Sequence, residues 1–164
     1  EALNMSDRIV VMNAGHFCQA GAPEDIYEHP NSMFTAKFIG QTNLVHAAVT
    51  DCAADGVCTL SIGGLPMAGR AQDRTYAAGE KVCVCLRMER VHFAAAHERA
   101  SLPATVTEKR YTGGTQRTVL RLPDGQEIVA IGVSHDGGDV SMGQSVQVWW
   151  DPATAALVPE EAEA

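Results

Sequence analysis

Short runs of large apolar or β-branched residues recur along most of the chain, separated by residues that form turns. From residue 42 onward seven such runs occur, at 44–49, 57–62, 81–86, 104–111, 115–122, 127–131 and 145–150. Glycine pairs or an Asp-Gly pair lie between several of them, and these residues favour tight turns. Many short strands at this spacing predict a mainly β fold, namely a small antiparallel barrel or sandwich.

The run at 115–122 has the alternation of a strand with one solvent-exposed face. Its even-numbered positions, Thr118, Leu120 and Leu122, point to one side of the strand. The cationic positions Arg117 and Arg121 point to the other side, together with the valine between them. The pattern predicts that the even-numbered face is buried and the odd-numbered face is in water.

The first forty residues have a different pattern, and residues 1–5 have the character of the last turn of a helix. Residues 8–12 are a run of large side chains typical of a strand buried on both faces, and 16–20 can return antiparallel to it. A helix is predicted from Pro23 to the residues before Pro30, because proline fits a first helical turn and disfavours helix just before itself. A second short helix is predicted with Phe34 and Phe38 one turn apart.

The composition excludes several classes of protein. The chain has 164 residues, 46% of them hydrophobic, and a net charge of −8, which suits one globular domain or one domain plus a fragment. An acidic chain without a Lys/Arg run lacks the charge that nucleic-acid binding requires, so no nucleic-acid partner is expected. No apolar stretch approaches the roughly 20 residues that span a bilayer, and no charged-then-apolar leader opens the chain, so no direct membrane insertion is expected.

The five cysteines are odd in number and include no C-x-x-C pair. Cys83 and Cys85 are two residues apart in an apolar run, so they share one face of a strand and are poorly placed to bridge to each other. We therefore predict a reduced chain with small, half-buried thiols.

No motif of nucleotide, zinc or serine-hydrolase chemistry is present. The chain lacks G-x-x-x-x-G-K-S/T, H-E-x-x-H and G-x-S-x-G, and its six histidines lack zinc-site spacing. We interpret residues 141–144 (Ser-Met-Gly-Gln) as a plain turn, and His135, Asp136 and Asp139 as solvated loop residues in place of an acid–base site. We expect no catalytic, cofactor-binding or metal-binding residue in this stretch.

One predicted hairpin is locally basic. It carries a single carboxylate, Glu108, against four cationic side chains: Lys109, Arg110, Arg117 and Arg121. Such a strip could bind a small anion or a single nucleic-acid strand, but Tyr111 is the only aromatic ring beside it, whereas single-strand binders stack several. We favour a solvated face.

Three consecutive stretches resemble the ATPase subunits of ABC transporters. Residues 6–15 resemble the segment directly after that family's switch histidine, and 19–30 resemble its Q-x-G-x-P-x-x-I-Y-x-x-P. Phe34-x-x-x-Phe38-Ile39-Gly40-x-x-Asn43 resembles F-x-x-x-F-I-G-x-x-N, where the ATPase domain hands over to a C-terminal domain.

Weaker matches follow in the same order. Residues 84–89 resemble V-x-x-R-P-E, with Met88 in place of proline, and 111–113 lie where the family has Y-L-G. Residues 143–150 resemble the closing G-x-x-V-x-V-x-W. Such chains end in a TOBE (transport-associated OB-type) domain, and the most similar subfamily serves importers of polyamines or iron(III).

The resemblance implies a division of the chain into three parts. Residues 1–41 would be a remnant of the ATPase domain, 42–158 a TOBE/OB-like β-domain, and 159–164 a disordered acidic tail. The family's phosphate loop, magnesium-binding carboxylate, signature sequence and switch histidine would all precede residue 1. The chain itself would then neither bind nor hydrolyse ATP, while ATP and magnesium would belong to a longer parent chain.

The function that the resemblance implies is that of a regulatory and dimerisation domain in an importer of spermidine and putrescine. Its partners would be a second copy of itself and the permease subunits, which would hold it on the cytoplasmic face of the plasma membrane. The alternative is a small-anion-binding OB-type module of an iron(III), molybdate or sulfate importer. The candidate regulatory or interface residues are Arg87, Glu89, Arg110, Arg117 and Arg121. We expect the first forty residues to dock on a β-domain, of the same chain or of a second one.

Overall fold

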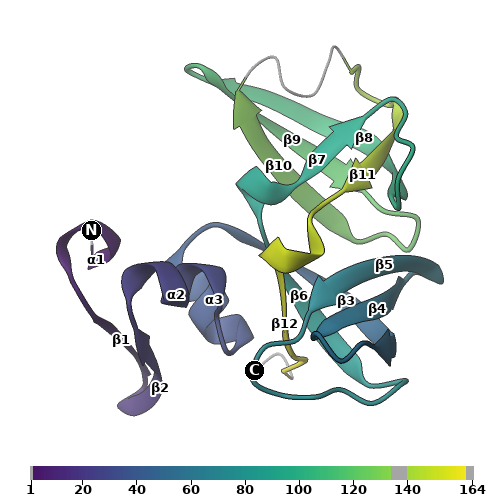
Figure 1. Cartoon of the computed structure of the whole chain (residues 1–164). Coiled ribbons are helices and arrows are strands. Elements are labelled where there is room, and N and C mark those ends of the chain that lie inside the picture. The colour runs from purple at the N-terminus through teal and green to yellow at the C-terminus, as the bar shows by residue number, and fades with distance from the viewer. Residues whose placement is uncertain (1, 134–139, 162–164) are drawn as a thin grey trace.

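The computed structural model describes residues 2–133 and 140–161 and confirms a mainly β, OB-like fold (Figure 1). A closed barrel, barrel 1, has the strand order β12-β5-β4-β3-β6. Its strands are β3 (Thr42–Cys52), β4 (Val57–Ile62), β5 (Leu65–Arg70), β6 (Lys81–Arg87) and β12 (Ala155–Pro159). Strand β12 closes barrel 1 by pairing antiparallel with β6 and, at one position, parallel with β5.

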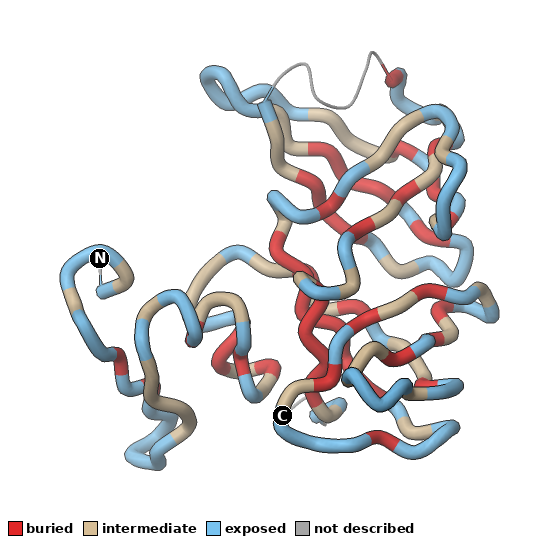
Figure 2. The backbone as a smooth tube through the Cα atoms, viewed as in Figure 1, coloured by how far each residue is buried: buried red, intermediate tan, exposed pale blue. Residues whose placement is uncertain are grey.

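A second five-stranded sheet, sheet 2, stacks on barrel 1 with the strand order β10-β9-β8-β11-β7. Its strands are β7 (His92–Ala94), β8 (Leu102–Thr112), β9 (Thr115–Arg121), β10 (Glu127–Val133) and β11 (Ser145–Trp149). Single 3-10 turns, η1 (Met88–Arg90) and η2 (Pro152–Thr154), connect the two bodies. One apolar core includes residues of both, and Figure 2 shows buried stretches in barrel 1 and in sheet 2.

The predicted alternation in β9 is confirmed, with one addition. Thr118, Leu120 and Leu122 are buried in sheet 2, whereas Arg121 is exposed and Arg117 is half-buried. Val119, predicted to face water, is also buried, next to its cross-strand partner Val129, which is buried too. On the odd-numbered face of β9, the two arginines are therefore accessible to solvent and the valine between them is not.

The N-terminal segment forms a small α/β unit beside barrel 1 (Figure 1). It contains α1 (Ala2–Met5), the hairpin β1 (Ile9–Asn13) and β2 (His16–Gly21), α2 (Pro23–Glu28) and α3 (Met33–Ile39). Within β1, Ile9 and Val11 are buried while Val10 and Met12 are about half exposed. The prediction of a strand buried on both faces is therefore wrong, because only the α2 side of the hairpin is covered.

Helix α3 docks the segment on the barrel of the same chain. Met33 and Ala36 pack on the outer face of β6, where Cys83 and Cys85 share one side as predicted. Phe34 and Phe38 stack at 5.7 Å between ring centroids. At the other end of the chain, Pro159 is the last residue of β12, and residues 162–164 of the predicted tail lie outside the described residues.

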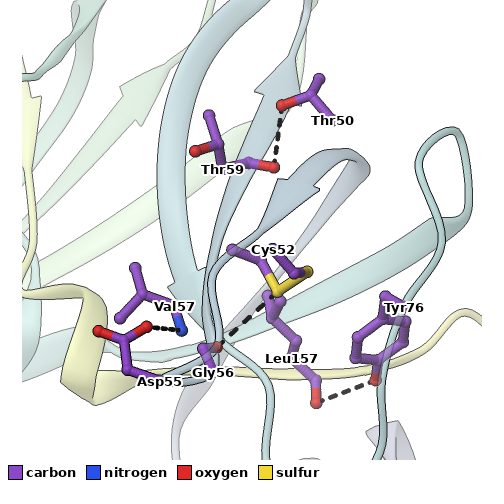
Figure 3. Close-up of a disulfide and its surroundings, with 9 residues drawn as sticks. Thr50, Cys52, Asp55, Gly56, Val57, Thr59, Tyr76 and Leu157 are labelled. Atoms are coloured by element: carbon purple, nitrogen blue, oxygen red, sulfur yellow. Dashed lines mark hydrogen bonds between the residues drawn. A yellow bond between two sulfur atoms is a disulfide. The ribbon is translucent and has the colours of Figure 1, made fainter.

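The prediction of a fully reduced chain is wrong in this structure, because Cys52 and Cys58 form a disulfide across β3 and β4 (Figure 3). The two residues are direct cross-strand partners, a relation that their C-x5-C spacing does not disclose. Cys18, Cys83 and Cys85 are free thiols. Within residues 2–133 and 140–161, no helix has the length and apolarity needed to cross a membrane.

Candidate functional site

The side chain of Arg87 ties the N-terminal segment to barrel 1. It is only 4% exposed, and its Nε and Nη2 atoms donate to the carbonyl oxygen of Tyr27 at 3.2 and 2.8 Å. Its Nη1 atom donates to the carbonyl oxygen of Ala36 at 2.9 Å. The guanidinium also lies 4.1 Å above the centre of the Tyr27 ring. We call Tyr27, Ala36, Arg87 and Glu89 the junction.

The junction joins β6 to the two helices α2 and α3. Arg87 is the last residue of β6, Tyr27 lies in the last turn of α2, and Ala36 lies within α3. Carbonyl groups in a last helical turn lack intrahelical donors and carry the negative end of the helix dipole, so a cation is a suitable partner for them. Burial lowers the pKa of Arg87, which nevertheless stays a cation at any physiological pH.

Glu89 and its neighbour extend the junction to the surface. The phenol of Tyr27 donates a hydrogen bond to a carboxylate oxygen of Glu89. Burial, followed by this bond to Glu89, raises the pKa of Tyr27 to about 12. Arg90 forms an ion pair with Glu28 at 3.1 Å. The helix α2 is thus held to η1 by two side-chain pairs and to β6 by Arg87.

Asn43 makes the corresponding connection between barrel 1 and sheet 2. Its buried side chain accepts from the backbone N–H of Val129 at 2.7 Å and donates to the carbonyl of Val129 at 2.8 Å. The side chain of Gln126 makes the same pair of bonds to the backbone of His46, at 2.8 and 3.0 Å. Two amide side chains therefore satisfy backbone groups that a neighbouring strand would otherwise pair with.

The predicted basic strip is separate from the junction and is largely paired with carboxylates. Arg110 and Arg117, which are cross-strand partners on β8 and β9, lie 3.2 and 3.6 Å from the same carboxylate oxygen of Glu108. Arg121 pairs with Glu127 at 3.1 Å. Of the five candidate residues, the structure brings Arg87 and Glu89 together around Tyr27, and Arg110 and Arg117 around Glu108, and leaves Arg121 apart from both pairs.

A cavity of about 350 Å³ lies on the open side of sheet 2, between its edge strands β7 and β10. Its polar lining includes Gln116, Thr118 and Gln144, and its apolar lining includes Phe93 and Trp149. Among the described residues, the lining includes the ionisable side chains of Glu89 and His92 but no lysine or arginine.

Three candidate groups from the sequence remain: metal ligands, the turn at residues 141–144, and the loop with His135, Asp136 and Asp139. The described residues contain no group of three or more His, Cys, Asp or Glu side chains that could hold a metal ion. Residues 141–144 form a turn, in which the N–H of Gln144 donates to the carbonyl of Ser141 at 3.1 Å. His135, Asp136 and Asp139 lie outside the described residues.

Sequence analysis missed the roles of Tyr27 and Asn43, although both stand in quoted motifs. Two signals were available in the sequence. Asn43 is a polar amide at the start of a predicted strand, and Tyr27 is an aromatic residue near the end of a predicted helix. Their partners come from docking between distant elements, and spacing along the chain does not reveal these contacts.

The chain is similar to known proteins along its whole length. The TOBE domain family model matches residues 84–158. The "Spermidine/putrescine import ATP-binding protein PotA" of Marinobacter nauticus is 34% identical over 167 residues, which cover 100% of this chain and 45% of that protein. The protein of the same name from Methylococcus capsulatus is 37% identical over 170 residues, with 99% and 43% covered. The chain thus spans less than half the length of these relatives.

A solved structure is similar in fold. The cytoplasmic molybdate-binding protein ModG, with molybdate bound, superposes with a TM-score of 0.64 at 18% sequence identity. The superposition covers 73% of this chain and 98% of that one. At this identity the likeness concerns the fold alone.

Proposed function

Because the chain carries a TOBE domain and is homologous along its whole length to the C-terminal part of ATP-binding subunits of polyamine importers, we propose that it regulates and dimerises such a subunit. The observation that carries the proposal is the similarity over 100% of the chain to a protein named for spermidine and putrescine import. The transported substrates would accordingly be these polyamines.

The proposed mechanism starts from the junction. Arg87 binds carbonyl groups of two different helices, so a displacement of α2 or α3 is transmitted to β6 and through it to barrel 1. Two copies that touch through their β-domains would keep two ATPase domains at high effective concentration while these open and close. A ligand of the β-domain would shift this equilibrium only through different affinities for the two states.

The other parts of the proposal concern the longer protein. Since this stretch has no phosphate-loop motif, ATP and magnesium would bind elsewhere in the subunit, and the stretch itself would neither bind nor hydrolyse ATP. The permease subunits of the importer would be the partners that place it on the cytoplasmic face of the membrane.

Small-anion binding is the alternative, and it has less support. The molybdate-binding protein resembles this chain only in fold. Arg110 and Arg117, the residues that suggest an anion site, already share Glu108. Calorimetric titration with molybdate, sulfate and phosphate separates the two functions, because an importer's dimerisation domain is expected to give no heat of binding with these ions.

Light scattering coupled to size-exclusion chromatography tests the dimerisation. The expected result is a mass twice that of the 17.4 kDa chain at high micromolar concentration, decreasing on dilution. A single-chain mass at every concentration would contradict dimerisation through this stretch.

Titration with ATP and magnesium tests the proposal that this stretch has no nucleotide site. Saturable binding at micromolar affinity would contradict that proposal.

A further inference from the structure

The disulfide between Cys52 and Cys58 joins the last residue of β3 to the second residue of β4 (Figure 3). Disulfides are uncommon in the cytoplasm, and those that form there are usually transient and take part in catalysis or redox sensing. We propose that Cys52 and Cys58 are a thiol–disulfide exchange site for a protein dithiol, and that their redox state controls how firmly barrel 1 holds the N-terminal segment. The proposal depends on the proposed function only for its cytoplasmic location.

Contacts that start at the disulfide lead to the N-terminal segment. The cysteines close the turn at residues 53–57, in which the N–H of Ala53 donates to the carbonyl of Val57 at 2.9 Å. The carbonyl of Gly56 in this turn accepts from the N–H of Ala71 at 2.9 Å. The next residue, Gln72, donates from its side chain to the carbonyl of Pro30 at 3.0 Å. The disulfide-closed turn is therefore joined through Gly56, Ala71 and Gln72 to Pro30, which lies between α2 and α3.

The conformation of the turn and its contact with Ala71 favour glycine at residue 56. Gly56 has a φ of +89°, and a Cβ atom there would lie 3.2 Å from the carbonyl oxygen of Ala71. The turn and the loop at residues 70–76 line one side of a groove of about 1570 Å³, and Gln19, Asp25 and His29 line the other. A looser turn would therefore change the wall of this groove and the position of Gln72 across it.

The difference in burial between the cysteines sets the direction of the exchange. Cys58 is fully buried and Cys52 is half-buried, so an incoming thiolate attacks the more accessible sulfur of Cys52. The bond to Cys58 breaks, and Cys58 takes up the proton of the reductant's second thiol. The second thiol of the reductant then attacks the mixed disulfide at the reductant's own sulfur and releases Cys52. Two electrons and two protons pass to the chain, which gains two thiols, and the reductant becomes a disulfide.

The other cysteines do not compete for this role. Cys83 and Cys85 are buried under α3, and a hydrogen bond with Cys83, together with burial, raises the pKa of Cys85, so its reactive thiolate form is suppressed. The half-buried Cys18 lies in β2. Within the described residues, Cys52 and Cys58 are the only cysteines joined by a disulfide.

Redox titration of the full chain with reduced and oxidised dithiothreitol tests the exchange. Samples equilibrated at each ratio are denatured and alkylated with a maleimide. Intact mass spectrometry then gives the number of alkylated thiols per chain. The expected result is a reversible change between three and five alkylated thiols. Five thiols at every ratio would overturn the proposal, and so would three thiols that never become five.

Hydrogen exchange in the two end states tests the control of the N-terminal segment. We expect reduction to accelerate exchange at least about tenfold at the amide of Ala71 and measurably at residues 29–32, with no change in β9 and β10. Gln72→Ala should keep the effect at Ala71 and lose it at residues 29–32. Equal exchange at Ala71 in both states would overturn the proposal.

Two variants serve as controls. The double substitution Cys52→Ser and Cys58→Ser should exchange like the reduced chain and should not respond to oxidant, whereas Cys18→Ser should respond like the parent sequence. A redox response that survives the double substitution would assign the effect to another thiol. These outcomes are independent of the dimer mass and of the ATP titration, which test the proposed function.

Discussion

Replacing Arg87 with alanine should detach the N-terminal segment while both β bodies stay folded. The substitution removes three hydrogen bonds from a charged donor, two to Tyr27 and one to Ala36. It leaves the carbonyl of Ala36, deep in the contact, without this donor. Hydrogen bonds to charged groups contribute about 1.5–3 kcal/mol each, but the buried guanidinium has also lost its hydration. We expect a net loss of about 2–4 kcal/mol for docking.

Hydrogen exchange measures this loss by region. Because each 1.4 kcal/mol is a factor of ten, the amides of α3 should exchange about 30 to 700 times faster, provided they exchange through undocking. Strands β9 and β10, which lie in sheet 2 away from both helices (Figure 1), should keep their rates. Arg87→Lys keeps the charge but cannot span both carbonyls, so its effect should be intermediate.

The matched control is Arg90→Ala, three residues away. The side chain of Arg90 is 44% exposed and pairs with Glu28 on the surface, so its loss should cost less than about 0.5 kcal/mol and change α3 exchange by less than about threefold. Equal effects of the two alanine substitutions would refute the assignment of Arg87 as the main connection. An equal acceleration in β9 and β10 would refute local detachment and indicate global destabilisation.

Three further outcomes are expected. Leu120→Ala should lower the free energy of unfolding by about 2–5 kcal/mol and Arg117→Ala by less than about 0.5, and equal urea midpoints would show that the faces of β9 are misassigned. Asn43→Ala should cost about 1.5–3 kcal/mol because the backbone of Val129 loses both partners, with faster exchange at Val129 as the check; an unchanged rate there would contradict it. The raised pKa of Tyr27, about 12 against 10.0, means that its protonated form is favoured on folding, so its stability contribution is complete below pH 10 and is lost as the pH rises toward 12. Absorbance titration of the phenols should show this ionisation near pH 12 and its absence in Tyr27→Phe; an unchanged titration curve in that variant would contradict it.

Most strands could be predicted because their apolar residues alternate or are β-branched, as in β4 and β9. The three that were missed lack this signal. Strand β5 contains a proline and a glycine, β7 has only 3 residues, and β12 begins with two alanines. These strands are defined by pairing with neighbours that are already in place, and a local pattern does not contain that information.

Of the four junction residues, sequence analysis named only Arg87 and Glu89, and it could not give their contacts. The family motifs drew attention to Arg87 and Glu89, yet the partners of Arg87 are backbone carbonyls, which have no sequence signature. The arginines of the hairpin were predictable as surface groups. Their shared carboxylate, Glu108, follows only from the register of β8 against β9, which shifts at a bulge before Glu108.

The closure of barrel 1 by β12 has a consequence for the order of events during translation. Strands β3 to β6 leave the ribosome first, but the strand that closes them begins about 85 residues after β5 ends. At about 5–20 residues per second, this interval lasts about 4 to 17 s, longer than most elementary folding steps. During this time β5 and β6 can pair with β4 and β3, but the edge of each that β12 will cover lacks its partner, so the nascent chain exposes two unpaired strand edges while sheet 2 is being made. Synthesis of barrel 1 therefore begins before that of sheet 2, but barrel 1 is completed after it.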